Sequence, residues 1–257
     1  SIHQLDLTNL DLEIIVVNDC STDKTKRYLD SLQEVKVISS LNNLGVSQTR
    51  NIGIKRAKNE IIAFIDDDCY PDKDWLKNLL ENFKDNKVGF VYGPTFYINK
   101  NYKGHFPQRC VNVLDWPGAG NIAFRKDLFD KYGGFDSFFD KYHNEDTELA
   151  IRLAVNSVKY KYIEEAVVFH QPDKWNVKSL LSSAKNGSVW PMLKKKYLNH
   201  YKKFGGPVKY NIVDPQEYLF ILFLPVLIFI LLLRYLILGN RNLKLFFTKW
   251  PVWLLYK

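Results

Sequence analysis

The stretch Glu60-Ile-Ile-Ala-Phe-Ile-Asp-Asp-Asp68 decides the fold class of this 257-residue chain. Five apolar residues, 61–65, run without interruption into three aspartates, which is the pattern of a strand buried on both faces of a parallel sheet. Two similar runs precede it, at Glu13–Val17 and Val35–Ser39, with helical patterns between them. Strands that alternate with helices predict an α/β domain with a mostly parallel, doubly wound sheet and flanking helices.

Downstream of the three aspartates the same alternation continues more loosely. The spacing of apolar residues predicts a helix over Asp72–Phe83 and a longer strand over Val88–Ile98. A second helix is predicted over Asn144–Val155. A closing strand, Val158–Phe169, ends at His170. The predicted α/β body therefore reaches to about residue 173.

Charge divides the chain into an acidic body and a basic remainder. Residues 1–173 carry 22 Lys and Arg against 26 Asp and Glu, whereas residues 174–257 carry 14 against 2. We therefore predict three parts: a body over 1–173, a basic connector over 174–214, and a hydrophobic tail over 215–257. The three widely spaced cysteines form no metal-binding pattern and favour a reducing compartment.

The hydrophobic tail predicts an association with a membrane. Tyr218–Leu238 is apolar apart from Arg234, and 21 helical residues would span about 31 Å, close to the thickness of a bilayer core. Lysines before this run favour the cytoplasmic side of a cell membrane for the body. The alternatives are a buried helix packed on the body and, for the lysines, a nucleic-acid surface; we predict a membrane partner and no nucleic acid.

Acidic residues follow two of the predicted strands. Asp19 comes after the first, and Asp66, Asp67 and Asp68 come after the third. Because ligands of open α/β sheets bind at the carboxyl ends of the strands, these carboxylates are expected to converge on one rim. A divalent cation, Mg²⁺ or Mn²⁺, would offset their repulsion. The alternative is that they only form turns and helix caps.

Five ordered segments resemble the successive motifs of family 2 glycosyltransferases. They are Leu12–Asp23, Asn43–Gly53, Ala63–Asp68, Gly118–Arg125 and Asn144–Arg152. The resemblance implies a GT-A fold and an enzyme that moves a sugar from a nucleotide-diphosphate donor, with a UDP-sugar expected first, to a hydroxyl of a glycan or lipid-linked acceptor, with inversion.

The resemblance also implies roles on the donor side. Asp19 corresponds to the residue that binds the donor base. Asp66 and Asp68 correspond to the DxD carboxylates, the first facing the ribose and the second the metal, and Asp67 is the variable middle position beside the nucleotide sugar. Arg50 lies in the segment near the nucleotide and is expected to contact phosphate. Its alternative is a surface arginine on a helix.

On the acceptor side, Asp146 corresponds to the family's catalytic base, held at the beginning of a helix. Glu145, Gly118, Gly120 and Trp116 are placed around the sugar and acceptor. The alternatives are that the two acidic residues only complement the helix dipole, that the glycines are structural, and that the tryptophan belongs to the core.

Three further expectations follow from the resemblance. His170 corresponds to a position that completes the metal site in some relatives, although a structural histidine is the alternative. The segment 184–190 lacks the Gln-x-x-Arg-Trp motif of processive relatives, which favours single additions. The family's first strand has no counterpart before the segment that begins at Leu12. The chain is then either a fragment of a longer protein or a catalytically impaired, membrane-anchored accessory subunit, which is the alternative function. A metal-dependent nucleotidyl or phosphoryl transferase that uses the same acidic residues is a third possibility.

Overall fold

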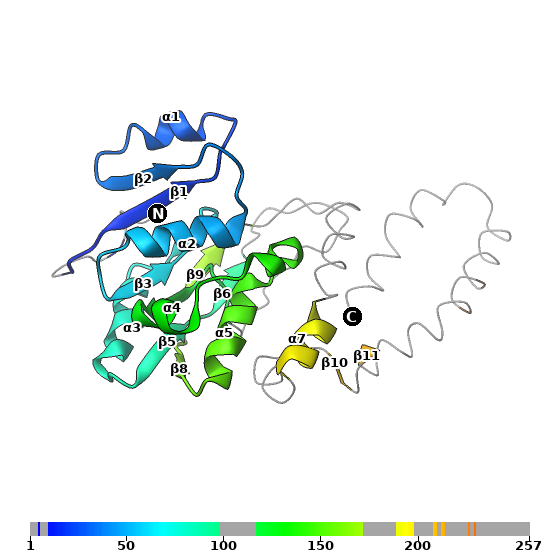
Figure 1. The fold of residues 1–257 in the computed structure, drawn as a ribbon. Coiled ribbons are helices and arrows are strands. Elements are labelled where there is room, and N and C mark those ends of the chain that lie inside the picture. The colour runs from blue at the N-terminus through cyan, green and yellow to red at the C-terminus, as the bar shows by residue number, and fades with distance from the viewer. Residues whose placement is uncertain are drawn as a thin grey trace.

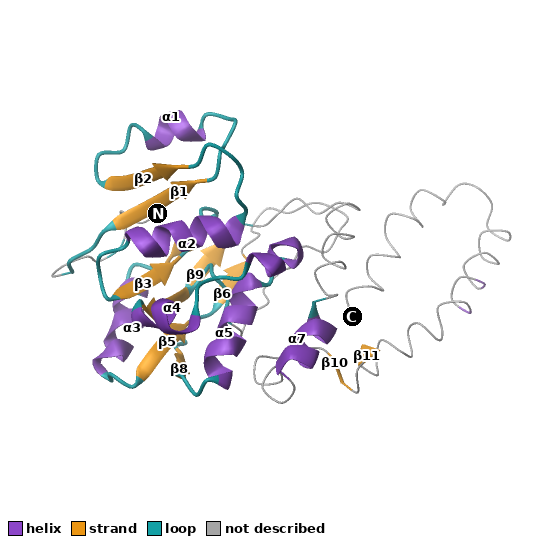
Figure 2. Ribbon diagram, in the orientation of Figure 1, coloured by secondary structure: helices purple, strands orange, loops and turns teal. Residues whose placement is uncertain are grey.

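The computed structural model describes residues 5, 10–97, 117–171, 189–197, 208–209, 212–213, 226 and 229. Within them the chain folds into layers of strands and helices (Figures 1 and 2). Trp116 and almost all of the predicted tail lie outside the described residues. Among the described residues, the structure contains no helix of the length and apolar character needed to cross a membrane.

The first layer is a two-stranded parallel sheet. β1 (Ile14–Asn18) pairs with β2 (Val35–Ser39) in a register that sets Ile14 opposite Val35. α1 (Thr25–Leu29) connects the two strands, and α2 (Val46–Arg56) packs against β1. The strands predicted from the two apolar runs are confirmed.

The central sheet has four strands in the order β3-β7-β5-β8. These are β3 (Ile61–Phe64), β7 (Ile122–Arg125), β5 (Val88–Tyr92) and β8 (Lys159–Tyr162). β7 is antiparallel to both of its neighbours, whereas β5 and β8 are parallel. The prediction of a mostly parallel sheet is therefore wrong, and the sheets are mixed. β7 follows a connection of more than 20 residues, so no short crossover imposes its direction.

A three-stranded sheet carries the acidic turn. β4 (Cys69–Pro71) pairs antiparallel with β9 (Val168–His170), which also pairs with β6 (Thr95–Tyr97). In this register Cys69 lies opposite His170. Residues 88–98 and 158–169, each predicted as one strand, are both divided in two.

The division of residues 88–98 has a steric cause at Gly93-Pro94. A Cβ on Gly93 would lie 2.1 Å from the carbonyl oxygen of Ala166, so the two backbones touch at this point. Pro94 has no N–H to donate to a ladder. The strand therefore ends at Tyr92 and resumes at Thr95 in a different sheet.

The central sheet is covered by helices on both faces (Figure 2). Phe90, Ile122 and Phe124 pack into one core cluster with α4 (Asp127–Tyr132), α5 (Glu145–Val155) and α7 (Trp190–Tyr197). Alternate residues of the same strands, Val91 and Ala123, pack on the other face with α3 (Trp75–Glu81). This alternation is the period of two that a strand imposes. The remaining short elements are η2 (Asn82–Lys84), η3 (Ser137–Tyr142), β10 (Val208–Lys209) and β11 (Ile212–Val213).

β1 and β3 are two of the edge strands in the described part of the chain. β1 pairs with β2 alone, and β3 pairs with β7 alone, in separate sheets. The apolar residues Ile14–Val17 and Ile61–Phe64 are only partly buried, although such runs are typical of central strands. Both strands therefore combine the sequence of a central strand with an edge position among the described residues.

Candidate active site

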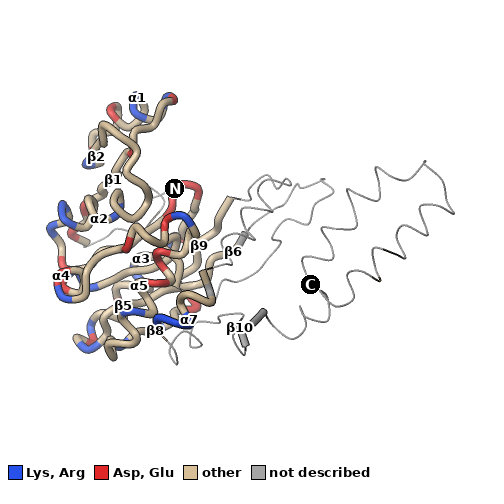
Figure 3. The backbone as a smooth tube through the Cα atoms, turned by 45° about the vertical axis from the view of Figure 1, so that its right-hand side comes forward, with Lys and Arg blue, Asp and Glu red and all other residues tan. Residues whose placement is uncertain are grey.

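The three aspartates form the turn between β3 and β4. The N–H of Cys69 donates to the carbonyl oxygen of Asp66 at 3.1 Å, which closes this turn. Asp67 is exposed, whereas Asp66 and Asp68 are partly buried. Figure 3 shows acidic stretches of the chain close together in the middle of the body. A Cβ at Gly120 would lie 3.0 Å from Asp66 Oδ2, so the glycine lets the backbone approach this carboxylate closely.

Four side chains beside this turn form a candidate metal-binding group. Asp66, Asp68, Cys69 and His170 each offer one ligand atom, and these atoms lie within 4.8 Å of one another. Burial and the neighbouring carboxylates of Asp66 and Asp68 raise the pKa of Cys69 to about 12. Carboxylates are the ligands that suit Mg²⁺ and Mn²⁺, whereas a thiolate suits softer metals, so we expect the two carboxylates and the imidazole to be the donors.

The orientation of His170 fits this role. Its Nδ1 lies 2.6 Å from the carbonyl oxygen of Gln171, which can only accept, so Nδ1 carries a proton. Its Nε2 then faces Asp68 Oδ1 at 3.3 Å. With Nδ1 directed at this carbonyl, Nε2 and Asp68 Oδ1 lie close enough to bind a common cation.

Arg50 connects the acidic turn to α5. It projects from α2, its Nη2 lies 3.1 Å from Asp66 Oδ1, and its Nη1 donates to Glu145 Oε1. Burial alone would lower the pKa of Arg50, but the carboxylates of Asp146, Glu145 and Asp66 raise it. The arginine is therefore a partly buried bridge between two acidic residues, which the sequence pattern did not predict.

Asp146 lies in the first turn of α5 and is held by three donors. Its Oδ2 accepts from the N–H of Ala119 at 2.9 Å, and its Oδ1 accepts from the N–H and the hydroxyl of Thr147 at 2.6 and 3.3 Å. Gly118 and Ala119 thus bring the segment before β7 up to the carboxylate. A Cβ at Gly118 would lie 3.7 Å from Asp146 Oδ2, an ordinary contact, so this glycine is not required by the space around Asp146.

Glu145 is a buried acid beside the predicted base. The residue is 4% exposed, and its Oε2 has no hydrogen-bond partner among the described residues. Burial and the adjacent Asp146 carboxylate raise the pKa of Glu145 to about 7, because the attraction of Arg50 does not outweigh them. The site therefore contains a carboxyl group that changes its protonation near neutral pH.

We expect this carboxyl group to make the stability of the protein depend on pH. In the folded state Glu145 holds its proton up to about pH 7, whereas the unfolded chain releases it near the ordinary value of 4.5. The free energy of unfolding should therefore fall as the pH rises from 4.5 to 7, by roughly 3 kcal/mol from this group. Urea denaturation at several pH values measures the fall, and Glu145→Gln should remove it. An equal pH dependence in the protein and the variant would contradict the assignment.

The other predicted residues lie at different places. Asp19 follows β1, and its carboxylate accepts from the N–H groups of Leu44 and Gly45 at 2.7 and 3.0 Å. It thereby fixes the loop before α2 and is not part of the candidate metal-binding group. The expected convergence of Asp19 with Asp66, Asp67 and Asp68 on one rim stays a prediction. The predicted roles of the site residues remain predictions.

Sequence reasoning missed four polar residues that organise this region. They are Ser47, Asp140, Glu148 and Arg152. The Asp140 carboxylate accepts from the N–H and the hydroxyl of Ser47 in the first turn of α2. Glu148 is fully buried although it is charged. Its position among the apolar residues of α5 was the one feature of the sequence that could have indicated a buried acid.

Solved structures define the fold class. Staphylococcus aureus TarS 1–349 in complex with UDP-GlcNAc superposes with a TM-score of 0.59 at 20% identity, covering 77% of this chain and 61% of that one. A mannosyltransferase from Pyrobaculum calidifontis in complex with GDP-Man and Mn²⁺ superposes with a TM-score of 0.51 at 19% identity, covering 83% and 60%. The chain therefore has a GT-A-like α/β fold with mixed sheets.

The family follows from the sequence match. Residues 1–146 match the model of Glycosyl transferase family 2, and the chain belongs to this family. Escherichia coli WfaP, described as a UDP-Glc:alpha-D-GlcNAc-diphosphoundecaprenol beta-1,3-glucosyltransferase, is 33% identical over 60% of this chain and 63% of its own length. The chain spans less than half the length of several other curated relatives that it matches.

Proposed function

We propose that this chain is an inverting glycosyltransferase that uses a divalent metal and a nucleotide-diphosphate sugar. The observation that carries the proposal is the joint placement of three groups. The acidic turn with His170 offers a cation site, Arg50 bridges that turn to α5, and Asp146 stands in the first turn of α5. Family membership supports the class of reaction.

The proposed step is a single displacement at the anomeric carbon of the donor sugar. The acceptor hydroxyl gives its proton to Asp146 while its oxygen forms the new bond to that carbon. The bond from the carbon to the diphosphate oxygen breaks on the opposite side, and the electron pair leaves with the nucleoside diphosphate. The donors from Ala119 and Thr147 fix the direction of the Asp146 carboxylate during this step.

A divalent cation would be held by Asp68 and His170, with Asp66 beside them. When bound, Mg²⁺ or Mn²⁺ supplies charge neutralisation for the departing diphosphate. The mixed carboxylate and imidazole set suits Mn²⁺ better than Mg²⁺. The crystallised mannosyltransferase contains Mn²⁺, which supports this choice.

The proposed donor and acceptor are taken from proteins to which this chain is similar. WfaP is named for UDP-Glc and a diphosphoundecaprenol-linked acceptor, and the TarS structure contains UDP-GlcNAc. We therefore propose a UDP-sugar as donor and a lipid-linked or cell-envelope glycan hydroxyl as acceptor, with one sugar added per encounter. The basic residues and the apolar run of residues 174–257 support a position at the cytoplasmic face of the cell membrane. Sedimentation with anionic vesicles tests that position.

The decisive experiment measures sugar transfer and hydrolysis from a panel of UDP-sugars and GDP-mannose with Mn²⁺, in the full protein that contains this sequence. We expect Asp68→Asn to weaken Mn²⁺-dependent donor binding about tenfold or more, because one charged ligand is lost. The exposed Asp130 of α4 provides a matched control, and Asp130→Asn should change binding less than about twofold. Turnover that is unchanged in both Asp68→Ala and Asp146→Ala would overturn the proposed mechanism, whereas no transfer by the unsubstituted protein from any donor of the panel would favour an accessory subunit.

A further inference from the structure

α7 comes from the predicted connector, yet it packs against α5. Val189 and Leu193 are fully buried and join the core cluster that contains Leu149 and Leu153 of α5. Figure 1 shows α7 beside α5. The last residues of α7, Lys196 and Tyr197, reach a buried acid of α5.

That acid is Glu148, whose side chain is 0% exposed. It accepts from Arg152 Nη2 at 2.8 Å, from Lys196 Nζ at 2.9 Å and from the hydroxyl of Tyr197. A buried carboxylate is tolerated only when its hydrogen bonds and its charge are satisfied. α7 supplies two of its three partner residues, although it lies almost 50 positions away in the sequence.

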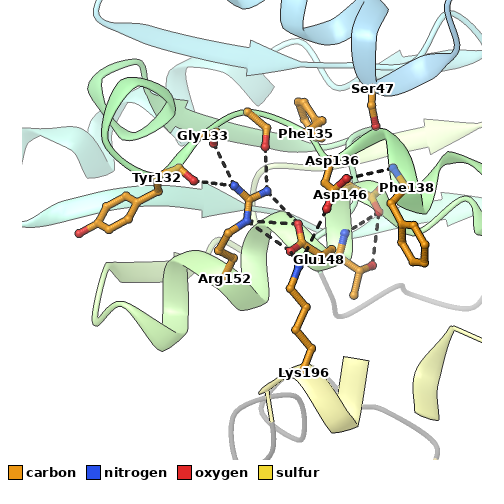
Figure 4. Close-up of polar contacts among 12 residues, drawn as sticks. Ser47, Tyr132, Gly133, Phe135, Asp136, Phe138, Asp146, Glu148, Arg152 and Lys196 are labelled. Atoms are coloured by element: carbon orange, nitrogen blue, oxygen red, sulfur yellow. Dashed lines mark hydrogen bonds and ion pairs between the residues drawn. The ribbon is translucent and has the colours of Figure 1, made fainter. Parts of the chain in front are cut away.

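The same network fixes residues 132–140, which we call the strap. Arg152 donates to three successive carbonyl oxygens of the strap, those of Tyr132, Gly133 and Gly134, at 2.6, 3.2 and 2.7 Å (Figure 4). Lys196 Nζ also lies 3.9 Å from Asp136 Oδ2. The strap is thus anchored to α5 and α7 at both sides of Phe135.

The other side of the strap contacts α2. Asn51 donates to the carbonyl oxygen of Phe135 and accepts from its N–H, both at 2.9 Å. Asp140 accepts from the N–H of Ser47 at 3.2 Å in the first turn of α2. The ring of Phe135 lies 5.4 Å from the guanidinium carbon of Arg50. The strap therefore sets the position of the helix that carries Arg50.

The contacts are too close for the strap to shift without moving α2. A Cβ on Gly134 would lie 2.1 Å from Asn51 Oδ1, so the backbone of the strap rests directly on this side chain. Gly133 adopts a φ of 82°, a conformation that favours glycine. The contacts of α7 with Glu148 and Asp136, and those of the strap with Asn51 and Arg50, thus form a continuous path from α7 to α2 and to the first turns of α5.

We infer that Lys196 and Tyr197 of α7 are positioning residues of the active site, which hold Glu148 and the strap so that Arg50 and Asp146 keep their geometry. This inference rests on the proposed function for its kinetic consequence, whereas the structural coupling is tested separately by hydrogen exchange. Residues 190–197 of the connector are thereby part of the catalytic unit, and their role is not only to link the body to the rest of the chain.

The test compares Lys196→Met with Lys195→Met in the full protein. Both lysines are exposed residues of α7 and both changes remove one positive charge, but the contact with Glu148 is made by Lys196. Lys196→Met should lower kcat about tenfold with a donor KM changed less than about threefold, at a temperature where circular dichroism shows the variant folded. Lys196→Arg should restore most of the activity, because it returns a donor to Glu148. Equal kcat in the two methionine variants would overturn the inference.

Hydrogen exchange gives a readout that needs no activity. The amide of Ala119 donates to Asp146, and the amide of Ser47 donates to Asp140. Both should exchange about tenfold faster in Lys196→Met than in Lys195→Met, while the amide of Phe90 in the central sheet is unchanged. Unaltered exchange at Ala119 and Ser47 would refute the coupling. If the unsubstituted protein transfers no sugar but the exchange differs as expected, the proposed function fails and the coupling holds.

Discussion

Asp146→Asn is expected to lower kcat for sugar transfer by about 10³-fold, within the 10²- to 10⁴-fold range typical of a general base. The amide cannot take the proton of the acceptor hydroxyl. Its oxygen can still accept from Thr147, but its NH₂ group would then face the N–H of Ala119, which now donates to Asp146 Oδ2 at 2.9 Å. The loss of the base and the altered direction of the side chain act together.

Donor binding separates this chemical role from a general disturbance of the site. Asp146 does not belong to the candidate metal-binding group, so the affinity for a UDP-sugar with Mn²⁺ should change less than about threefold in Asp146→Asn. Calorimetric titration measures that affinity, and single-turnover kinetics measure the transfer step. Asp127→Asn, in the first turn of α4 and exposed, is the matched control and should retain full activity. Transfer by Asp146→Asn at more than one third of the original rate would exclude Asp146 as the base.

The fold could be predicted where local pattern and final environment agree. The strands β1, β2 and β3 were predicted because continuous apolar runs end at polar turns, and α2 lies where a helical pattern separates the second run from the third. The direction of β7 could not be predicted, since it depends on pairing with β3 and β5 and not on its own residues. The break at Gly93 depends on the backbone of Ala166, more than 70 positions away.

Some residues of the candidate site could likewise be predicted from the sequence, and others could not. Asp66, Asp68 and His170 were singled out from the ends of strands, and the pairing of β4 with β9 brings them together. The bridge from Arg50 to Glu145 joins residues 95 positions apart, and no local spacing predicts such an ion pair. Glu148 is the acid of α5 that matters most for packing, although glutamate is a residue type usually found on the surface. Only the docking of α7 explains why it is buried.

Glu148→Gln should lower the free energy of unfolding by about 3–5 kcal/mol, the usual cost of breaking a buried ion pair by removing one partner. The charges of Arg152 and Lys196 would remain beside a neutral side chain, and Arg152 is only 18% exposed. Urea denaturation at pH 7 measures the loss. Glu81→Gln removes an exposed ion pair with Lys84 and serves as the control, with a change below about 1 kcal/mol.

The pH dependence of stability provides a second, independent test of the predicted role of Glu148. Burial opposes ionisation of Glu148, but hydrogen bonds and charges from Arg152, Lys196 and Tyr197 outweigh it and lower the pKa of the carboxyl group. A lowered pKa in the folded state stabilises the fold above the ordinary value of 4.5, and this contribution is lost as the pH falls through the folded pKa. The difference in stability between the protein and Glu148→Gln should therefore be largest at neutral pH and shrink below pH 4.5. A difference that stays constant down to pH 3 would show that Glu148 stabilises the fold by its shape and not by its charge, because only the charged form pairs with α7.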